Sequence, residues 1–504
     1  MYLSKKFSPR FGEHIYKLFL IIIVGGLFFR LQKISVIPFH DWDESIYARL
    51  AKEGLSQFVF PQYLSTPWLE KPPFPIFIWQ FLVNLGKPEV SLRFVSLLVS
   101  IGIIFLVLKL IKRINTDSTT SSLQTIMTSS VGLSILISSN FFLDRSLLVN
   151  VDLFLLFSWL GYIYFRNQNN LILNSIFIFI GVMSKSILGF FPLVIDLFFI
   201  LISKNTKRLK SFFYKLPLLI IPSLIWFVLA YFRYGRLFIN EHFRDHLFLR
   251  LVQPIELHFG GKLFYLIEIQ KDFSLMSLLI ITLIISTLII YFRNFKKVNL
   301  KSLINQEIFL IAVSITLYLF FLTFTKSKLS WYIGPLIPLI AILSATLFNY
   351  ILRNFKHLSY LIFAIILLVG FYQFSLNTYF WHPRIDNFAA TTLLGKCIYK
   401  HHQNNKVSPP IKLLVASNER ETAHVLEAAK LNISTSFRYA GMPGMIYYAY
   451  PQLFEIFYKE DLFQKSLVKS DFLVIKNTDL RFIPSIFSSN SICKVSDWNY
   501  LQLK

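Results

Sequence analysis

Charged residues are scarce in this chain. Asp, Glu, Lys and Arg make up 15% of its 504 residues, whereas soluble domains average about 25%. The apolar residues, 55% of the total with a mean hydropathy of +0.56, gather in repeated runs. Many of these runs approach the roughly 17 to 25 residues that a helix needs to cross a bilayer core. The composition therefore excludes an ordinary soluble domain and predicts a polytopic α-helical membrane protein.

Acidic residues are especially few. The chain has 27 Asp and Glu against 51 Lys and Arg, which gives a formal net charge of +24. One continuous basic patch would have indicated a nucleic-acid-binding protein. The basic residues instead form small clusters at the ends of apolar runs, as in the cytoplasmic loops of membrane proteins. We therefore expect no nucleic-acid partner.

A signal-peptide cleavage site is also missing. Lys5, Lys6 and Arg10 precede a run of apolar residues at 18–29, which is the start of a secretory signal peptide, but no small-residue cleavage site follows. The run predicts an uncleaved first membrane span.

Eleven apolar segments predict transmembrane helices. Five basic clusters alternate with them so that all five lie on one side, which the positive-inside rule makes cytoplasmic. The loop at 33–89, the loop at 233–272 and the C-terminal tail then share the extracytoplasmic side. The predicted spans are 15–32, 90–110, 123–138, 153–165, 171–183, 187–202, 216–232, 273–290, 308–324, 332–352 and 358–374.

The spans define a membrane domain over residues 1–376, whose outer loop 33–89 contains two predicted interfacial helices. The first covers residues 44–54, and the second covers 73–86 and begins at prolines. Residues 377–504 predict a small extracytoplasmic α/β domain. Its strand-like segments are 412–417 and 472–475, and its helix-like segment is 421–431.

The chain has only two cysteines. Cys397 and Cys493 both lie in this C-terminal domain. An oxidising extracytoplasmic compartment would permit a disulfide between them. Two free thiols are an equally good interpretation of the sequence.

An acidic stretch interrupts the apolar pattern near the start of the outer loop. Asp41, Asp43 and Glu44 lie close together, and Asp43 shares a helical face with Tyr47 if a helix begins there. Carboxylates beside a membrane need water, a cation or a chemical role. The two interpretations are a helix N-cap, which would satisfy free backbone N–H groups, and a catalytic carboxylate.

Further charged residues follow at predicted outer edges of the spans. Glu70 and Lys71 precede two prolines, which hold extended backbone and also suit a surface turn. Asp152 begins an apolar run, where a carboxylate is costly unless it faces a cavity or a partner such as Arg145. Lys185 lies in another outer turn, where snorkelling to the interface would also explain it.

In this order and spacing the motifs resemble those of polytopic GT-C glycosyltransferases. In particular they resemble the lipid A aminoarabinose transferase and dolichyl-phosphate-mannose protein mannosyltransferase relatives, over about residues 16–352. This chain departs from them at Ser186, where a glycine usually follows the lysine, in its shorter membrane region and in its unmatched tail. The motifs are Asp43-Glu44-x-x-Tyr47, Glu70-Lys71-Pro72-Pro73, Ser91-Leu92-Arg93, Arg145 with Asp152, Lys185, Glu241-His242, and Ser327-Lys328-Leu329-Ser330-Trp331-Tyr332 with Pro335.

The resemblance implies a sugar donor on polyprenyl phosphate and inverting attack by an acceptor hydroxyl of a lipid, glycan or protein. It also implies a bacterial inner membrane location, with membrane lipids around the protein and the active site on the extracytoplasmic side. Such transfer needs a carboxylate for the acceptor proton and cations for the departing phosphate. The expected residues are Asp43 and Asp152 as catalytic carboxylates, Lys71, Lys185 and Arg244 at the phosphate, Tyr47, Lys328 and Tyr332 lining the site, and Glu70 with His242 holding a divalent cation, zinc or magnesium.

A polytopic transporter or lipid flippase is the alternative, and a non-catalytic membrane scaffold is a third. A transporter predicts internal repeats and helices broken near the membrane midplane. The sequence shows no clear repeat, and its charges gather at one face, so the glycosyltransferase interpretation is preferred.

Overall fold

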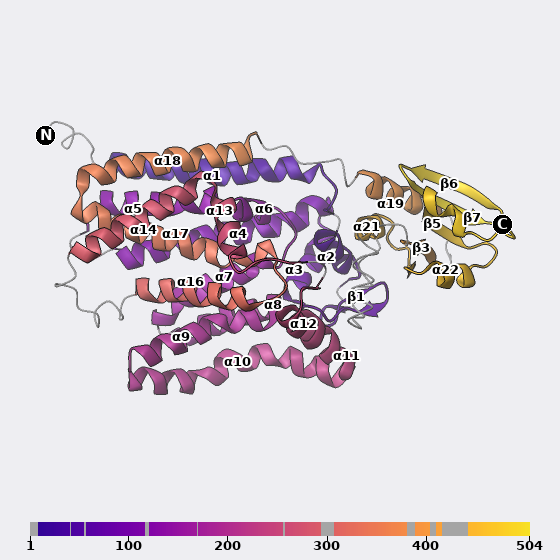
Figure 1. Ribbon diagram of the computed structural model, residues 1–504, viewed down its shortest axis with the longest axis horizontal. Coiled ribbons are helices and arrows are strands. Elements are labelled where there is room, and N and C mark those ends of the chain that lie inside the picture. The colour runs from indigo at the N-terminus through magenta and orange to yellow at the C-terminus, as the bar shows by residue number, and fades with distance from the viewer. Residues whose placement is uncertain are drawn as a thin grey trace.

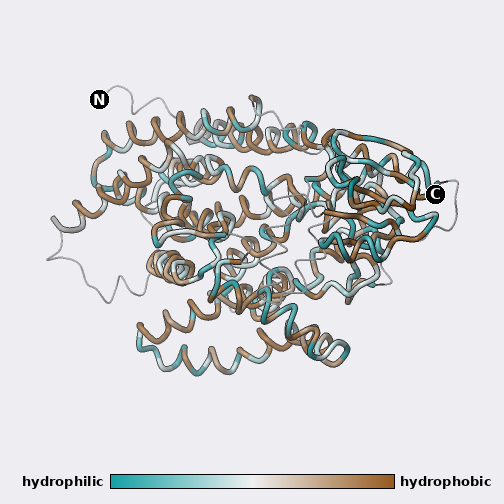
Figure 2. The backbone as a smooth tube through the Cα atoms, turned by 45° about the vertical axis from the view of Figure 1, so that its right-hand side comes forward, coloured by the Kyte–Doolittle hydropathy of each residue, from teal (hydrophilic) through white to brown (hydrophobic). Residues whose placement is uncertain are grey.

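Long apolar helices pack side by side and form a bundle, and a small sheet domain lies at one end of it (Figure 1). The helices are mostly hydrophobic along their length, whereas hydrophilic residues concentrate in the turns and in the sheet domain (Figure 2). The computed structural model describes residues 9–40, 42–54, 57–115, 120–168, 170–255, 258–293, 307–380, 389–403, 410–415 and 442–504.

Each of the eleven predicted spans overlaps a helix of the bundle. Side chains on the outside of the bundle are apolar, for example Phe232 and Leu368, which are 80% and 70% exposed. A soluble surface would not expose such residues in large patches, whereas lipid favours them. The helices are α1 (Pro9–Ser35), α4 (Pro88–Asn115), α5 (Ser122–Ser138), α7 (Asp152–Phe165), α8 (Leu171–Lys185), α9 (Phe191–Ile202), α10 (Thr206–Tyr234), α14 (Leu275–Arg293), α16 (Glu307–Phe324), α17 (Leu336–Asn354) and α18 (Lys356–Thr378).

The chain is an integral membrane protein by its composition and fold. Within the described residues, seven helical stretches are long and apolar enough to cross a membrane, or eight if α13 (Phe264–Phe273) and α14 form one span bent by 110°. The apolar helices α5 and α7 are shorter. Eleven crossings therefore remain a prediction, although all the predicted segments are helical.

One long stretch, Leu171–Ile202, contains a reversal of direction. Lys185 at the end of α8 pairs with Asp152 at the start of α7. Asp196 in α9 instead pairs with Arg166, which follows the end of α7. The two arms of the stretch therefore run antiparallel and match the two separate spans expected from the sequence.

The described basic clusters lie at one end of the bundle. Arg113 at the end of α4 pairs with Glu307 at the start of α16 at 2.7 Å, and Arg353 at the end of α17 donates to the Asn115 carbonyl. The turn between α9 and α10 lies at the same end, opposite the sheet domain (Figure 1). We call this the basic end. The cluster expected at residues 293–301 lies outside the described side chains.

Short segments cover the other end of the bundle, between the long helices and the sheet domain. Both predicted interfacial helices are present there, as α2 (Asp43–Lys52) and α3 (Phe74–Leu82). The remaining segments are the strand pair β1 (Gln62–Tyr63) and β2 (Thr66–Pro67), α6 (Asn140–Arg145), α11 (Arg236–Phe238), the π-helix Ile239–Phe248, α12 (Leu249–Val252), α13 and the 3₁₀ turns Ser186–Phe190 and Ser330–Ile333.

The C-terminal domain is a five-stranded sheet in the order β4-β3-β5-β7-β6, with β3 parallel to both neighbours and β7 antiparallel to both of its own. Both predicted strands are present, as β3 and β5, while the helix predicted at 421–431 lies outside the described residues. The elements are α19 (Ala389–His402), β3 (Ile411–Leu414), α21 (Pro443–Tyr448), β4 (Phe454–Phe457), α22 (Glu460–Ser466), β5 (Phe472–Lys476), β6 (Ser489–Val495) and β7 (Trp498–Leu503).

Two kinds of contact hold this domain together and attach it to the outer loop. A disulfide joins Cys397 in α19 to Cys493 in β6, which settles the choice that the sequence left open. Arg49 of α2 donates to the Ile446 carbonyl of α21 at 3.1 Å. The ammonium of Lys52 lies 4.1 Å from the ring centre of Tyr447, a cation–π distance.

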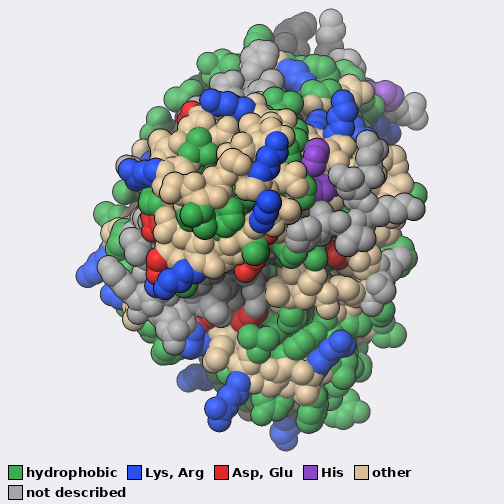
Figure 3. All heavy atoms as spheres, turned by 90° about the vertical axis from the view of Figure 1, so that its right-hand side faces the viewer, with side chains coloured by type: hydrophobic (Ala, Val, Ile, Leu, Met, Phe, Trp, Pro, Cys, Tyr) green, Lys and Arg blue, Asp and Glu red, His purple; other side chains and the backbone are tan. Residues whose placement is uncertain are grey.

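Figure 3 views the molecule from the end that carries the sheet domain. Asp and Glu side chains lie mostly across the middle of the face, whereas Lys and Arg side chains are spread over it.

Candidate active site

Asp43 begins α2 and is partly exposed. The N-cap position is Trp42, and no side chain caps the helix there, so the capping interpretation fails for Asp43. Its carboxylate forms no hydrogen bond or ion pair with the residues that the structure describes. Asp41 lies outside the described residues.

The neighbouring carboxylate, Glu44, is a buried structural anchor. It accepts two hydrogen bonds from Arg93, both at 2.8 Å, and two more from the backbone N–H groups of His40 and Val149. Burial alone would raise the pKa of Glu44, but Arg93 and these N–H groups lower it overall. Glu44 therefore fixes the start of α2 to α4 and to the segment before α7. The sequence placed both residues in motifs without indicating that they pair.

Lys71 and Tyr47 are in direct contact. The Lys71 ammonium donates to the Tyr47 hydroxyl, whose ring stacks on Trp79 at 5.4 Å and meets the edge of Trp68 at 6.2 Å. Burial, and then the charge of Asp43, raise the pKa of Tyr47, so it is a neutral phenol near pH 7.

Lys71 keeps its charge although it is partly buried. Burial lowers the pKa of Lys71, but Tyr47 and the carboxylates of Asp43 and Glu70 outweigh burial and raise it overall. Because Tyr47 is itself neutral near pH 7, we attribute the upward shift mainly to the two carboxylates. The site thus holds a permanent positive charge in a partly buried position, where it interacts with an anion more strongly than in bulk water.

A second charged group surrounds Asp152 at the start of α7. Its carboxylate is buried and accepts from the ammonium of Lys185, and it lies 3.7 Å from the guanidinium of Arg145. The Lys185 ammonium lies 5.3 Å from the ring centre of Tyr332, and Arg145 lies 5.6 Å from that of Trp331. The structure therefore brings Asp152, Lys185 and Tyr332 together.

The two groups form one cluster, because Lys71 is close enough to Asp152 to affect its ionisation. We call this the charge cluster: Asp43, Lys71, Arg145, Asp152 and Lys185. These five residues are three cations and two carboxylates, which leaves one positive charge among them; the carboxylate of Glu70, which also acts on Lys71, lies 3.3 Å from His246. Such a group of cations favours an anionic ligand, above all a phosphate.

Arg244, which was predicted at the phosphate, and Lys328, which was predicted to line the site, have other partners in the structure. Arg244 pairs with its neighbour Asp245 at 2.7 Å. Lys328 donates to the carbonyls of Leu322 and Thr323 at 2.8 and 2.9 Å, and thereby caps the end of α16. Burial lowers the pKa of Lys328. The described contacts therefore give Lys328 a structural role.

The predicted pair of Glu70 and His242 is not brought together as a pair of metal ligands. His242 is fully buried, its Nδ1 lies 2.9 Å from the Leu69 carbonyl, and its Nε2 lies 2.7 Å from the Ser186 hydroxyl. Both ring nitrogens are thus engaged by the protein. Burial lowers the pKa of His242 to about 4, so the ring is neutral near pH 7.

The histidine that meets Glu70 is His246, four residues further along the π-helix. Its Nε2 lies 3.3 Å from the Glu70 carboxylate. Two histidines at this spacing share a helical face, which is the sequence signal that would have drawn attention to His246. In the described part of the chain, no group of three or more His, Cys, Asp or Glu residues is placed to hold a metal ion.

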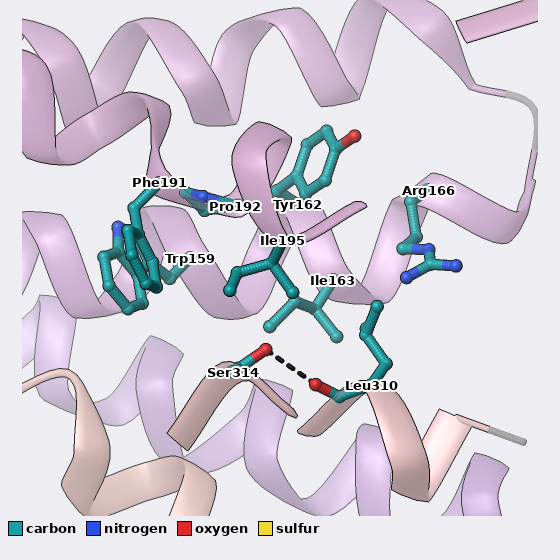
Figure 4. Close-up of a pocket in the computed structure, with 9 residues that line it drawn as sticks. All are labelled: Trp159, Tyr162, Ile163, Arg166, Phe191, Pro192, Ile195, Leu310 and Ser314. Atoms are coloured by element: carbon teal, nitrogen blue, oxygen red, sulfur yellow. Dashed lines mark hydrogen bonds between the residues drawn. The ribbon is translucent and has the colours of Figure 1, made fainter. Parts of the chain in front are cut away.

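A small pocket inside the bundle is separate from the charge cluster. It lies between α7, α9 and α16 (Figure 4), and the Ser314 hydroxyl in its wall donates to the Leu310 carbonyl at 2.8 Å. Asp196 accepts from the Tyr162 hydroxyl at 3.0 Å and pairs with Arg166 at 3.3 Å. We call Tyr162, Arg166 and Asp196 the inner triad.

Comparison with known proteins shows what part of this chain resembles. Residues 70–231 match the profile of the dolichyl-phosphate-mannose-protein mannosyltransferase family. That segment includes Lys71, Asp152 and Lys185, whereas Asp43 precedes it. No curated protein matches the chain. The profile match makes the chain similar to GT-C class glycosyltransferases, as the order of its motifs predicted.

Two solved structures share the whole fold. ArnT from Cupriavidus metallidurans bound to undecaprenyl phosphate is 13% identical, with a TM-score of 0.68 over 96% of this chain and 98% of that one. The apo form of the same protein is 12% identical, with a TM-score of 0.67 and 97% coverage of both chains. The likeness therefore includes the sheet domain as well as the bundle.

Proposed function

We propose that this protein is a membrane glycosyltransferase that moves a sugar from a polyprenyl-phosphate donor to an acceptor hydroxyl. The observation that carries the proposal is the charge cluster, which has carboxylates for proton transfer and an excess of cations for a phosphate. The family profile and the fold shared with an undecaprenyl-phosphate-bound ArnT support the same reaction class.

In the proposed reaction Asp43 is the general base. It is partly exposed, and its carboxylate is not bonded to any described residue, whereas Asp152 is held by Lys185 and Arg145. Asp43 takes the proton of the acceptor hydroxyl, and the hydroxyl oxygen forms a bond to the anomeric carbon. The bond from that carbon to the phosphate oxygen breaks, and its electron pair leaves with the lipid phosphate. Attack from the opposite face inverts the anomeric carbon.

The cations stabilise the leaving phosphate. Lys71 and Lys185 approach from different elements, the loop before α3 and the end of α8, and Arg145 lies beyond Asp152. Asp152 acts as their common counter-ion and holds them in place. Stabilisation of developing charge by preorganised donors is among the largest contributions to enzymatic rate.

We further propose that a divalent cation binds between Glu70 and His246. A carboxylate and an imidazole within 3.3 Å of each other are a suitable start for a Zn²⁺ site, and donor phosphate oxygens would supply the remaining ligands. When bound, the ion would add positive charge at the phosphate. Metal analysis of wild-type protein and of a Glu70→Ala, His246→Ala double variant tests this. Equal metal content in both proteins would contradict the proposed site. If metal is lost only when His242 is replaced, His242 is the ligand as the sequence predicted.

We place the charge cluster and the sheet domain on the extracytoplasmic side of a bacterial inner membrane, because the basic end is then cytoplasmic. Cysteines introduced at Ser65, near the cluster, and at Lys207, at the basic end, would test this with a membrane-impermeant thiol reagent. Only the cysteine at position 65 should react in intact cells. Labelling at position 207 alone would reverse the orientation.

The reaction is tested by transfer of a radiolabelled sugar from a polyprenyl-phosphate donor in proteoliposomes. Mass spectrometry of envelope glycolipids from cells with and without the gene would identify the acceptor, if it is a lipid, and the sugar. Failure of the purified protein to use or bind any polyprenyl-phosphate compound would contradict the proposed function.

A further inference from the structure

The residue after Lys185 adopts an unusual backbone conformation. Ser186 has φ +56° and ψ −139°, a combination that glycine adopts readily and that strains a residue with a Cβ atom. The turn that contains it is tightly packed, because a Cβ on Gly189 would lie 2.1 Å from the backbone nitrogen of Val182. A serine at a position that suits glycine requires a compensating contact.

That contact is the hydrogen bond to His242. The Leu69 carbonyl is only an acceptor, so the Nδ1 atom of His242 must carry the ring proton and donate to it at 2.9 Å. The Nε2 atom is then an acceptor, and the Ser186 hydroxyl donates to it at 2.7 Å. The hydrogen-bonding network thus assigns one tautomer of His242.

His242 links the two backbone segments that carry the cluster's lysines. Ser186 directly follows Lys185, and Leu69 precedes Lys71 by two residues. The charge of His242 is not needed for this, because a neutral ring makes both bonds.

The ring is held rigidly. His242 is fully buried on the π-helix, and four aromatic rings are centred 5.0 to 5.8 Å from its own: Trp226, Phe227, Phe238 and Phe243. Buried aromatic packing of this kind restricts rotation of the ring. π-Helical segments are rare and are frequent at functional sites.

We propose that His242 is a positioning residue that sets the separation of Lys71 and Lys185. It acts on Lys185 through its hydrogen bond to Ser186. The proposal rests on the proposed function, since it concerns the phosphate subsite of that reaction. It also gives His242 a role that leaves metal binding to His246.

The first test is the affinity of purified protein for undecaprenyl phosphate in nanodiscs. Ser186→Gly removes the hydroxyl but suits the backbone, so the thermal midpoint should not fall. The affinity should fall about three- to tenfold, the range that one hydrogen bond gives, because Lys185 is less firmly held. If Ser186 has only a structural role, the affinity of Ser186→Gly for undecaprenyl phosphate should equal that of the wild type, whatever its thermal midpoint.

Ser184→Ala is the matched control. Its hydroxyl is also buried near the end of α8, but it donates to the Ile180 carbonyl within the helix. This variant should bind undecaprenyl phosphate like the wild type. Equal losses in the Ser184 and Ser186 variants would overturn the proposal.

A double-mutant cycle tests whether His242 and Ser186 act together. His242→Asn keeps an amide donor near the Nδ1 position but does not reach Ser186. The double variant should therefore bind no more weakly than His242→Asn alone, whereas additive losses would show that the residues act independently. If His242→Asn does not fold, the Ser186→Gly and Ser184→Ala comparison decides.

Lys185→Met separates this proposal from the proposed function. Suppose that the wild-type protein binds undecaprenyl phosphate and that Lys185→Met weakens this binding but Ser186→Gly does not. In that case only the positioning role fails. If wild-type protein does not bind the lipid phosphate, the proposed function and the positioning role both fail.

Discussion

The charge cluster and the inner triad both join helices through acid–base contacts, but they differ in balance. In the inner triad one carboxylate, Asp196, pairs with one guanidinium and accepts from one hydroxyl, so the charges of the triad cancel. The charge cluster has three cations for two carboxylates, and Asp43 is bonded to no described residue. A balanced group needs no ligand, whereas an unbalanced group can bind and act on one. Charge balance therefore separates the two groups better than burial does.

The strongest test of this comparison is Asp43→Asn. Asparagine keeps the size of the side chain but cannot take a proton, so sugar transfer in proteoliposomes should fall about 10²- to 10⁴-fold. The thermal midpoint should stay close to that of the wild type, because the Asp43 carboxylate forms no hydrogen bond with a described residue. Wild-type turnover in a folded Asp43→Asn variant would show that the unbonded carboxylate is not the base.

Lys71→Met should have the next largest effect. It removes one charge-assisted contact to the phosphate, worth about 1.5–3 kcal/mol, so kcat/KM should fall roughly 10- to 100-fold. A raised KM for the lipid donor together with a lower kcat would indicate a contact that strengthens as the phosphate departs. A change in neither parameter would place the phosphate elsewhere.

The fold was largely predictable from the sequence, because membrane helices and their ends are encoded locally. The lengths of the apolar runs predicted the helices, and glycine and proline predicted the ends of α2 and α3. Adjacent motifs also identified Asp43, Lys71, Asp152 and Lys185. These residues flank helix ends, and the ends of helices in one bundle must meet at one of two faces.

Pairings between distant segments were not predictable in this way. Glu44 and Arg93 were predicted as parts of separate motifs, and Glu70 was paired with His242, whereas the histidine beside Glu70 is His246. The contact between the Lys328 ammonium and two carbonyls of α16 was also not predictable from the sequence. Each of these depends on which side chains face each other after packing, and a single sequence contains no record of that.

The pH dependence of stability sharpens the interpretation of His242. Its pKa is about 4 in the folded protein against 6.5 ordinarily, so between these values the unfolded chain binds a proton that the folded protein does not. Stability is therefore complete above about pH 6.5 and declines as the pH falls toward 4. The thermal midpoint of His242→Asn should fall less than that of the wild type over this range. Parallel curves would show that the ring titrates normally.

The smallest effect on activity is expected from Asp196→Asn in the inner triad. Asparagine still accepts from the Tyr162 hydroxyl but leaves Arg166 without its counter-ion, so we expect a stability loss of about 1–3 kcal/mol, seen as a lower thermal midpoint. Transfer by the folded fraction should stay within about twofold of the wild type, because the triad balances its own charge and lies apart from the cluster. Asp43→Asn should show the reverse pattern, with little change in midpoint and a large loss of turnover. If Asp196→Asn instead lowered turnover as strongly as Asp43→Asn does, a balanced acid–base group would be as important for the reaction as an unbalanced one, and charge balance would no longer distinguish structural from catalytic carboxylates in this bundle.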